Sequence, residues 1–181
     1  MARKIGMDRA LRILARSGNS KPALIFSLDA DTLVRPDYLS AVRSRYASKK
    51  MHTGVIAYAH QLPSEKADRV AIISYEIFLR YWVMGLQYAG SPYAFHSIGS
   101  TIVTTTDDYL GVRGMNRRAA GEDFYFLNKL AKTGSVGRID ETVVYPSGRI
   151  SARVPFGTGA AVGKIILGEQ AELQLYDPRV F

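Results

Sequence analysis

The feature that most constrains this chain is a short apolar run at residues 23–28, Ala-Leu-Ile-Phe-Ser-Leu, followed directly by Asp29-Ala30-Asp31-Thr32. A run of this length that ends in polar turn residues is typical of a buried strand, and it favours a strand in a parallel sheet. Ligands bind at the carboxyl ends of strands in open α/β sheets. The two aspartates therefore fall where a ligand would be expected.

The rest of the chain alternates between strand and helix patterns. Further strands are expected at residues 53–59, 100–104 and 137–145. Helices are expected at residues 2–16, 37–48, 65–88, 121–132 and 158–167, with a short helix capped around Thr106. This alternation predicts an α/β domain, and the absence of repeats and linkers predicts that residues 1–181 form a single domain.

In the first helix, five apolar side chains are expected to lie roughly on one face: Ile5, Met7, Leu11, Ile13 and Leu14.

Composition excludes several classes of protein. Of the 181 residues 47% are hydrophobic, which is enough to bury a core, and the absence of cysteine excludes disulfides and cysteine-based zinc sites. The first ten residues lack the apolar run of a secretory signal. Glu76 and Arg80 interrupt the longest apolar stretch, which argues against a membrane span. We expect a cytoplasmic protein, or one at the inner face of the membrane.

The charge balance is basic, with 24 Lys and Arg against 16 Asp and Glu, a net charge of +8. Such a balance suggests anionic partners. The positive residues are distributed as on solvated helix faces, and no basic arm, zinc finger or RNA-recognition motif is present. We therefore expect no nucleic-acid partner.

The two aspartates after the first strand are candidate metal ligands. Carboxylates at i and i+2 in a loop, here Asp29 and Asp31, can face one point and hold Mg²⁺ or Mn²⁺ on a diphosphate. The alternative is an ordinary turn or helix cap, because Asp is common after strands.

A second acidic pair, Glu122-Asp123, follows Gly121 at the start of an expected helix. The helix dipole stabilises carboxylates there, which is the structural explanation. The functional explanation is a general base that takes a proton from a substrate hydroxyl.

A Gly- and Ser-rich loop near the end of the chain carries Arg149 and Arg153 and continues into Gly157-Thr158-Gly159. Two arginines in such a loop could bind a phosphate, and the glycine-flanked helix start could offer backbone N–H groups to an anion. An exposed loop with a helix cap explains the same residues. The histidines show no metal-ligand spacing, and the dinucleotide and P-loop fingerprints are absent.

The segments ALIFSLDADTLVRPDYL and GMNRRAAGEDFYFLNKLAKTG, preceded by an ARKIGMDRAL helix, resemble the family-2 inverting glycosyltransferases of the GT-A type. In that family a strand ends in a DxD motif, and a Gly-rich acceptor loop leads to an ED pair on a helix. The resemblance covers residues 1 to about 158. It implies a partial GT-A-type, Rossmann-like mixed sheet flanked by helices.

The resemblance also implies roles for the acidic residues. Asp31 would bind Mn²⁺ or Mg²⁺ on the diphosphate of a nucleotide-sugar donor, and Asp29 would contact the ribose or support the metal. Asp123, with Glu122 beside it, would be the base that activates the hydroxyl of a sugar or lipid-linked acceptor.

Four further residues are candidates for substrate binding. Gly99 and Ser100 fall where the acceptor loop of the family is expected, while Arg149 and Arg153 would contact the diphosphate or the acceptor.

The chain departs from the family at its start, because nothing before Arg3 corresponds to the strand–helix–strand unit that holds the donor nucleotide. We therefore expect the DxD and acceptor-side portion of a larger glycosyltransferase domain. A sheet without its first strands exposes an edge, so a homo-oligomer is also expected.

Two other functions remain open. Asp29-Ala30-Asp31-Thr32 also resembles the nucleophile motif of haloacid-dehalogenase-type phosphatases, although Leu33 stands where that family prefers Thr or Val. A non-catalytic binding or interaction module is the second alternative.

The helix expected at residues 65–88 is apolar over much of its circumference. A central core helix is one explanation. The other is a surface for peripheral membrane contact or for a lipid-linked acceptor.

Overall fold

The computed structural model describes residues 2–18, 23–48, 51–118, 120–151, 157–168 and 174–181. The chain divides into two compact units. Unit 1 comprises Met1–Tyr58 and Ser97–Val144, and unit 2 comprises Ala59–His96 and Tyr145–Phe181. Because each unit is assembled from two separate segments, no single linker divides the chain. That the units form one larger domain stays a prediction.

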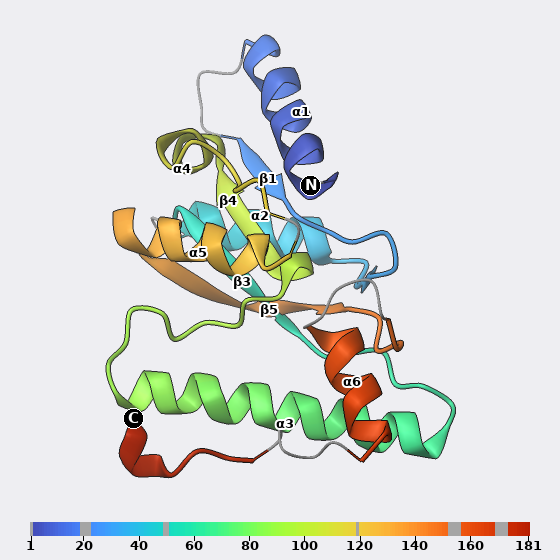
Figure 1. The fold of residues 1–181 in the computed structure, drawn as a ribbon. Helices are drawn as coiled ribbons and strands as arrows, with labels where there is room; N and C mark the ends of the chain where they lie inside the picture. Colours follow the sequence, from blue (N-terminus) through green and yellow to red (C-terminus); the bar gives the residue numbers. More distant parts are fainter. Residues whose placement is uncertain (1, 19–22, 49–50, 119, 152–156, 169–173) are drawn as a thin grey trace. The chain divides into compact units, whose positions relative to one another are not determined.

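Unit 1 is built on a mixed five-stranded sheet in the order β1-β4-β3-β5-β2 (Figure 1). Its strands are β1 Leu24–Phe26, β2 Leu33–Val34, β3 Thr53–Tyr58, β4 Ile102–Thr105 and β5 Val136–Tyr145. β3 pairs in parallel with β5, whereas β4 is antiparallel to both β1 and β3. The predicted α/β class with a mixed sheet and flanking helices is confirmed.

The strand after the first helix differs from its prediction. β1 is three residues long and antiparallel to β4, with Leu24 opposite Thr105 and Phe26 opposite Val103. The expectation of a parallel strand was wrong because an apolar run reports burial and carries no information about the direction of the neighbouring strand. Among the described strands, β1 and β2 form the two edges of the sheet. β2 was not expected, since it is only two exposed residues long.

The helices of unit 1 lie close to their expected positions. They are α1 Ala2–Arg16, α2 Tyr38–Ser48, α4 Thr106–Gly111 and α5 Glu122–Thr133. The cap of α4 is Thr105, not the expected Thr106: its side-chain oxygen accepts a hydrogen bond from the backbone N–H of Asp108.

The apolar face expected on α1 is only partly correct. Met7 is buried, but Ile5 and Ile13 are exposed. At about 100° per residue, Met7, Leu11 and Leu14 share one side of the helix while Ile5 and Ile13 point elsewhere. α1 therefore packs against the rest of unit 1 through a narrower apolar stripe than the sequence pattern predicts.

The hydrophobic core of unit 1 is formed by side chains of both the strands and the helices. Its buried apolar side chains include Ile25, Ile56, Ile102, Val103, Ile139 and Val144 from the strands and Val42, Tyr109, Phe126, Leu127 and Leu130 from the helices.

Unit 2 contains α3, Lys66–Tyr88, and α6, Thr158–Ile166. Val162 of α6 packs against Ala71 and Ile72 of α3. The long helix was predicted correctly, but several of its apolar residues are exposed, among them Ile73 and Trp82. The expectation of a central core helix therefore holds for one side of α3 only. No helix among the described residues is both long enough and apolar enough to cross a membrane.

Candidate functional site

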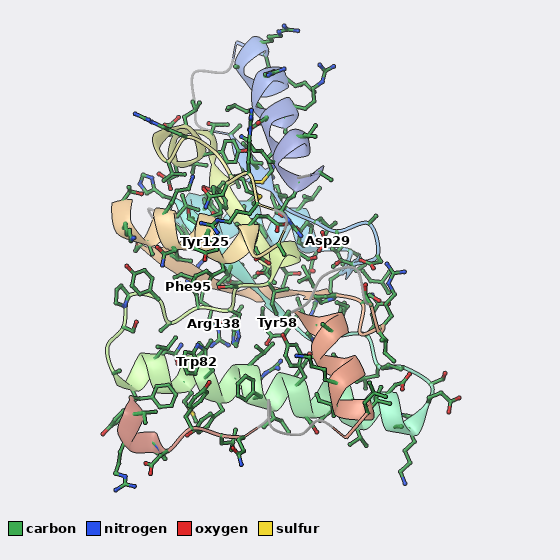
Figure 2. The ribbon with its side chains drawn as sticks, in the orientation of Figure 1. Asp29, Tyr58, Trp82, Phe95, Tyr125 and Arg138 are labelled. Carbon is green, nitrogen blue, oxygen red and sulfur yellow. The ribbon has the colours of Figure 1, made fainter. Side chains whose placement is uncertain are left out.

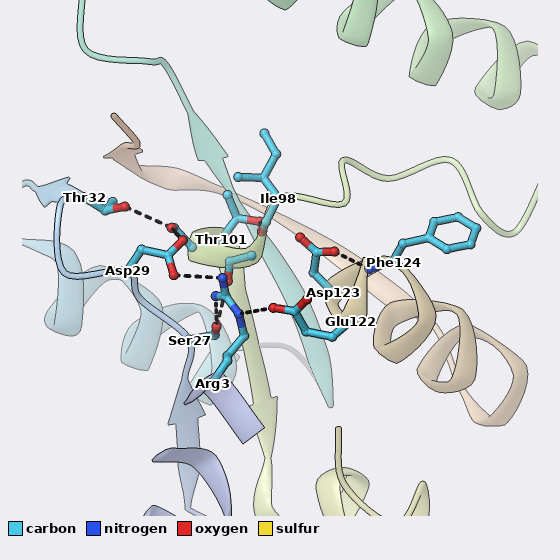
Figure 3. A network of polar contacts seen from close by, with 11 residues as sticks. Arg3, Ser27, Asp29, Thr32, Ile98, Thr101, Glu122, Asp123 and Phe124 are labelled. Carbon is cyan, nitrogen blue, oxygen red and sulfur yellow. Dashed lines mark hydrogen bonds and ion pairs between the residues drawn. The ribbon is translucent and has the colours of Figure 1, made fainter. Parts of the chain in front are cut away.

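The centre of the candidate site in unit 1 is the side chain of Arg3, near the start of α1 (Figure 3). Its Nη2 donates to Oδ1 of Asp29 at 2.8 Å, and its Nε donates to Oε1 of Glu122 at 3.3 Å. Its Nη1 donates to Oγ of Ser27 at 2.6 Å. The guanidinium thereby connects the loop after β1 with the first turn of α5, and it is largely shielded from solvent.

Asp29, the first aspartate of the motif, has both carboxylate oxygens engaged. Oδ1 accepts from Arg3, and Oδ2 accepts from Oγ of Ser100 at 2.6 Å. The buried Oγ1 of Thr32 lies 2.9 Å from Oγ of Ser100, and the backbone N–H of Thr32 closes a turn onto the carbonyl of Asp29. Asp29 is thus held in one orientation by a charged donor and a hydroxyl donor.

Gly99 leaves room for the side chain of Arg3 because it has no Cβ atom. A Cβ atom built on Gly99 would overlap the guanidinium of Arg3, so no larger residue fits without displacing it. The carbonyl of Gly99 accepts a hydrogen bond from Oγ of Ser27 at 2.7 Å, while that Oγ itself accepts from Arg3. Gly99 and Ser100, expected to bind substrate, lie beside the two acidic motifs as part of this network.

The acidic pair stands at the start of α5. Gly121 precedes it with a φ of 69°, a left-handed conformation that suits glycine. Glu122 is paired with Arg3, whereas Oδ1 of Asp123 accepts from the backbone N–H of Phe124 at 2.8 Å.

Burial is the main cause that raises the pKa of the Asp123 carboxyl above its ordinary value, and the charge of Glu122 adds to it. The N–H of Phe124 and the charge of Arg3 oppose this rise without cancelling it. A partly buried carboxylate with a raised pKa is suited to accept a proton.

The carboxylates near the DxD loop form no complete metal site. Among the described residues, no group of three or more His, Cys, Asp or Glu could hold a metal ion together. Asp31 is exposed on the loop after β1, and Asp29 is held by Arg3 and Ser100. Mg²⁺ is commonly bound through one or two carboxylates together with substrate phosphates. Substrate phosphates would therefore have to supply most of the ligands of a metal ion at this loop.

Arg149 is exposed and belongs to unit 2, and Arg153 lies outside the described residues. The residues that come together in unit 1 are therefore Asp29, Gly99, Ser100 and Glu122, with Asp123 adjoining them.

Sequence reasoning missed Arg3, Ser27 and Thr32. In the sequence Arg3 is one of several basic residues near the start of the chain, and its partners Ser27, Asp29 and Glu122 lie 24, 26 and 119 residues away. No local pattern could have identified such a contact.

In comparisons with protein-family models, curated proteins and solved structures, no significant match to this chain was found. Function must therefore be argued from the site itself.

Proposed function

We propose that this chain carries the catalytic side of a metal-dependent, inverting glycosyltransferase. It would transfer a sugar from a nucleotide-diphosphate donor to the hydroxyl of a sugar or lipid-linked acceptor. The observation that supports this most is the Arg3 bridge, which ties the DxD loop at Asp29 to the Glu122-Asp123 pair. A donor-binding loop and a candidate base are thereby held together by one side chain.

Asp123 is the base in this proposal. Its carboxylate takes the proton of the acceptor hydroxyl while the acceptor oxygen forms a bond to the anomeric carbon. The bond from that carbon to the leaving diphosphate oxygen breaks on the opposite side, so the configuration inverts. The raised pKa of Asp123 favours proton uptake, and Glu122 and Arg3 fix the first turn of α5 from which it projects.

The charge of the site favours a role for a divalent cation. Four carboxylates, from Asp29, Asp31, Glu122 and Asp123, lie on the two connected motifs, and the guanidinium of Arg3 bridges these motifs. An approaching diphosphate is repelled by this excess of negative charge. Mg²⁺ or Mn²⁺ held by Asp31 would neutralise charge on the diphosphate.

The geometry argues against the phosphatase alternative. There Asp29 would be the nucleophile, but both of its oxygens accept strong hydrogen bonds, from Arg3 at 2.8 Å and from Ser100 at 2.6 Å. These donors lower the nucleophilicity of the carboxylate. The non-catalytic module is left as the competing explanation, and turnover distinguishes the two.

The test is release of nucleoside diphosphate from a panel of nucleotide sugars with Mn²⁺ or Mg²⁺ present. Asp123→Asn keeps the size of the side chain but removes the base, and we expect turnover to fall about a hundredfold or more. Donor affinity should change little. Asp31→Ala should instead abolish the dependence of donor binding on metal, as measured by calorimetry.

Asp107→Asn is the matched control, since Asp107 is an exposed carboxylate in the first turn of another helix of unit 1. It should retain parental turnover. Near-parental turnover by Asp123→Asn would reject the assigned base. If the parent chain turns over none of the donors, the binding-module explanation is favoured.

A further inference from the structure

An apolar stripe runs along α3 in unit 2. Its side chains are between 43% and 86% exposed, and they are Val70, Ile73, Ile77, Met84 and Tyr88. Their spacing of three, four, seven and four residues places them on one side of the helix. Because Val70 and Tyr88 of α3 are 18 residues apart, the α3 stripe extends over about 27 Å.

The neighbouring side of α3 is covered by the end of the chain, residues 174–181 (Figure 1). Trp82 projects from α3 (Figure 2). Its ring lies 5.1 Å from that of Tyr176 and 5.4 Å from that of Phe181. Gly85 leaves room for the ring of Phe181, because a Cβ atom there would overlap it. Tyr81 also donates its hydroxyl hydrogen to the carbonyl of Tyr176.

This terminal segment widens the apolar surface. Leu175, Tyr176 and Val180 are themselves exposed next to α3. The α3 stripe and the terminal segment together offer a long surface that is rich in aliphatic and aromatic groups.

Basic side chains border the α3 stripe on its other side. Arg69 and Arg80 lie there, Lys66 stands at the N-terminal end of the stripe itself, and all three are exposed. Asp68 points to the opposite side of the helix, at about 100° per residue. Glu76 is largely buried, and its carboxylate is paired with Arg80 and His60.

We propose that α3 lies flat on an anionic lipid membrane, with the α3 stripe in the headgroup and acyl boundary. This proposal is independent of the proposed catalytic function. An exposed apolar stripe beside a basic edge, with Trp and Tyr nearby, is the pattern of helices that lie in the interfacial plane. The basic edge complements anionic headgroups, and long Lys and Arg side chains reach out to them while their stems remain on apolar surface.

Arg80 decides against a second copy of the chain as the occupant. It lies between Ile77 and Met84 along the helix and is about half exposed. In a helix–helix seam its guanidinium would be buried together with the Glu76 carboxylate that pairs with it, and desolvation of an ion pair is costly. At a membrane surface it remains hydrated and can contact lipid phosphates.

A fluorescent probe can be placed in the α3 stripe by Met84→Trp in a Trp82→Phe background, because Trp82 is the one tryptophan of the chain and packs against Tyr176 and Phe181 on another side of α3. With vesicles of phosphatidylcholine and phosphatidylglycerol, we expect the emission of this probe variant to shift to shorter wavelength. Lipids brominated on their acyl chains should quench it. In flotation assays the protein should bind these vesicles and bind vesicles of phosphatidylcholine alone at least about fivefold more weakly, because the basic edge loses its counterpart.

Variants separate the apolar from the electrostatic contribution. The double change Ile73→Glu, Ile77→Glu should lower binding at least about tenfold, and Arg69→Glu about fivefold. Ile13→Glu is the matched control: Ile13 and Ile77 are both 58% exposed, but Ile13 belongs to α1 in unit 1. That control should bind like the parent, and circular dichroism should confirm that every variant is folded.

Three results would overturn the proposal. One is the absence of vesicle binding by the parent and of an emission shift in the probe variant. Another is equal binding by the double variant and the Ile13→Glu control. The third is a dimer in sedimentation that the double variant dissociates, which would assign the α3 stripe to self-association.

Discussion

Each of the two units contains a cluster of polar and charged side chains. The central group is a cation in unit 1 and a carboxylate in unit 2. In unit 1 one guanidinium, that of Arg3, lies between the carboxylates of Asp29 and Glu122. In unit 2 one carboxylate, that of Glu76, lies between His60 and Arg80. Nδ1 of His60 is 2.7 Å from Oε1 of Glu76, and Nη1 of Arg80 is 2.7 Å from Oε2.

The Glu76 cluster has its hydrogen-bonding groups engaged. The His60 side chain is fully buried, and its Nε2 lies 3.2 Å from Oγ1 of Thr158 on α6. Burial by itself raises the pKa of Glu76, but hydrogen bonds from the side chain and backbone of His60 and the charge of Arg80 outweigh it and lower the pKa. Glu76 is therefore held ionised, and it connects α3, α6 and the segment around His60.

The Arg3 cluster is unbalanced by comparison. Two carboxylates compete for one cation, and the adjoining Asp123 has a raised pKa. A cluster in which every polar group has a partner, like that of Glu76, stabilises a fold. A cluster with more carboxylates than cations retains a group that can take up a proton. The comparison supports a structural role for Glu76 and favours the surroundings of Arg3 as the place of the proposed chemistry.

The largest effect on stability should come from Glu76→Ala. It leaves the backbone N–H and the buried ring nitrogen Nδ1 of His60 without their partner, and each buried polar group left unsatisfied costs about 1–3 kcal/mol. Denaturant unfolding measures this loss. Glu65→Ala, which removes an exposed carboxylate just before α3, should change the free energy of unfolding by less than about 0.5 kcal/mol. Equal losses of unfolding free energy in the two variants would show that the Glu76 cluster does not stabilise the fold.

Gly99→Ala should have the next largest effect. The added methyl group must displace the guanidinium of Arg3, and overpacking of this kind costs about 1–3 kcal/mol. Because Arg3 orients Asp29 and Glu122, turnover should fall with stability. Gly6→Ala is the control in α1: nothing lies within 4 Å of the place that its new methyl group would occupy, and it should gain about 0.5–1 kcal/mol. Unchanged stability and turnover in Gly99→Ala would mean that Arg3 does not depend on this glycine.

Most elements could be predicted from local patterns. The limits of α1, α3 and β3 agree with the sequence to within a residue or two, because apolar periodicity and turn residues are local signals. The direction of β1 relative to its neighbour could not be predicted, because that neighbour, β4, lies about 80 residues later in the chain.

The candidate site was predicted in part for the same reason. Asp29 and Glu122 each stand in a recognisable local motif, but the residue that connects them does not. Arg3 resembles any other basic residue of α1 until the fold brings it against Gly99. The apolar α3 was identified from sequence as well, yet which side of it is exposed depends on α6 and on residues 174–181.

The smallest effect, and the most direct contrast with Glu76, concerns Asp123 and pH. Its folded-state pKa is raised, so the folded protein holds the proton of Asp123 more tightly than the unfolded chain does. The stability contributed by this group is fully present below the unfolded pKa, about 3.9, and is lost as the pH rises through the folded pKa. Glu76, with a lowered pKa, contributes in the opposite direction: its stability is present above the unfolded pKa and is lost as the pH falls through its folded value.

Asp123→Asn should therefore be more stable than the parent at pH 7, while the difference should vanish near pH 3, where the parent carboxyl is protonated. Thermal unfolding across this pH range measures the difference, with Asp107→Asn as the exposed control that should show no such gain. The proposed reaction requires Asp123 to be ionised although it is partly buried. Asn cannot ionise, so the variant does not carry the free-energy cost of burying that charge. A variant less stable than the parent at pH 7 would mean that the carboxylate is stabilised by its surroundings, like Glu76, and would remove the electrostatic argument for Asp123 as the base.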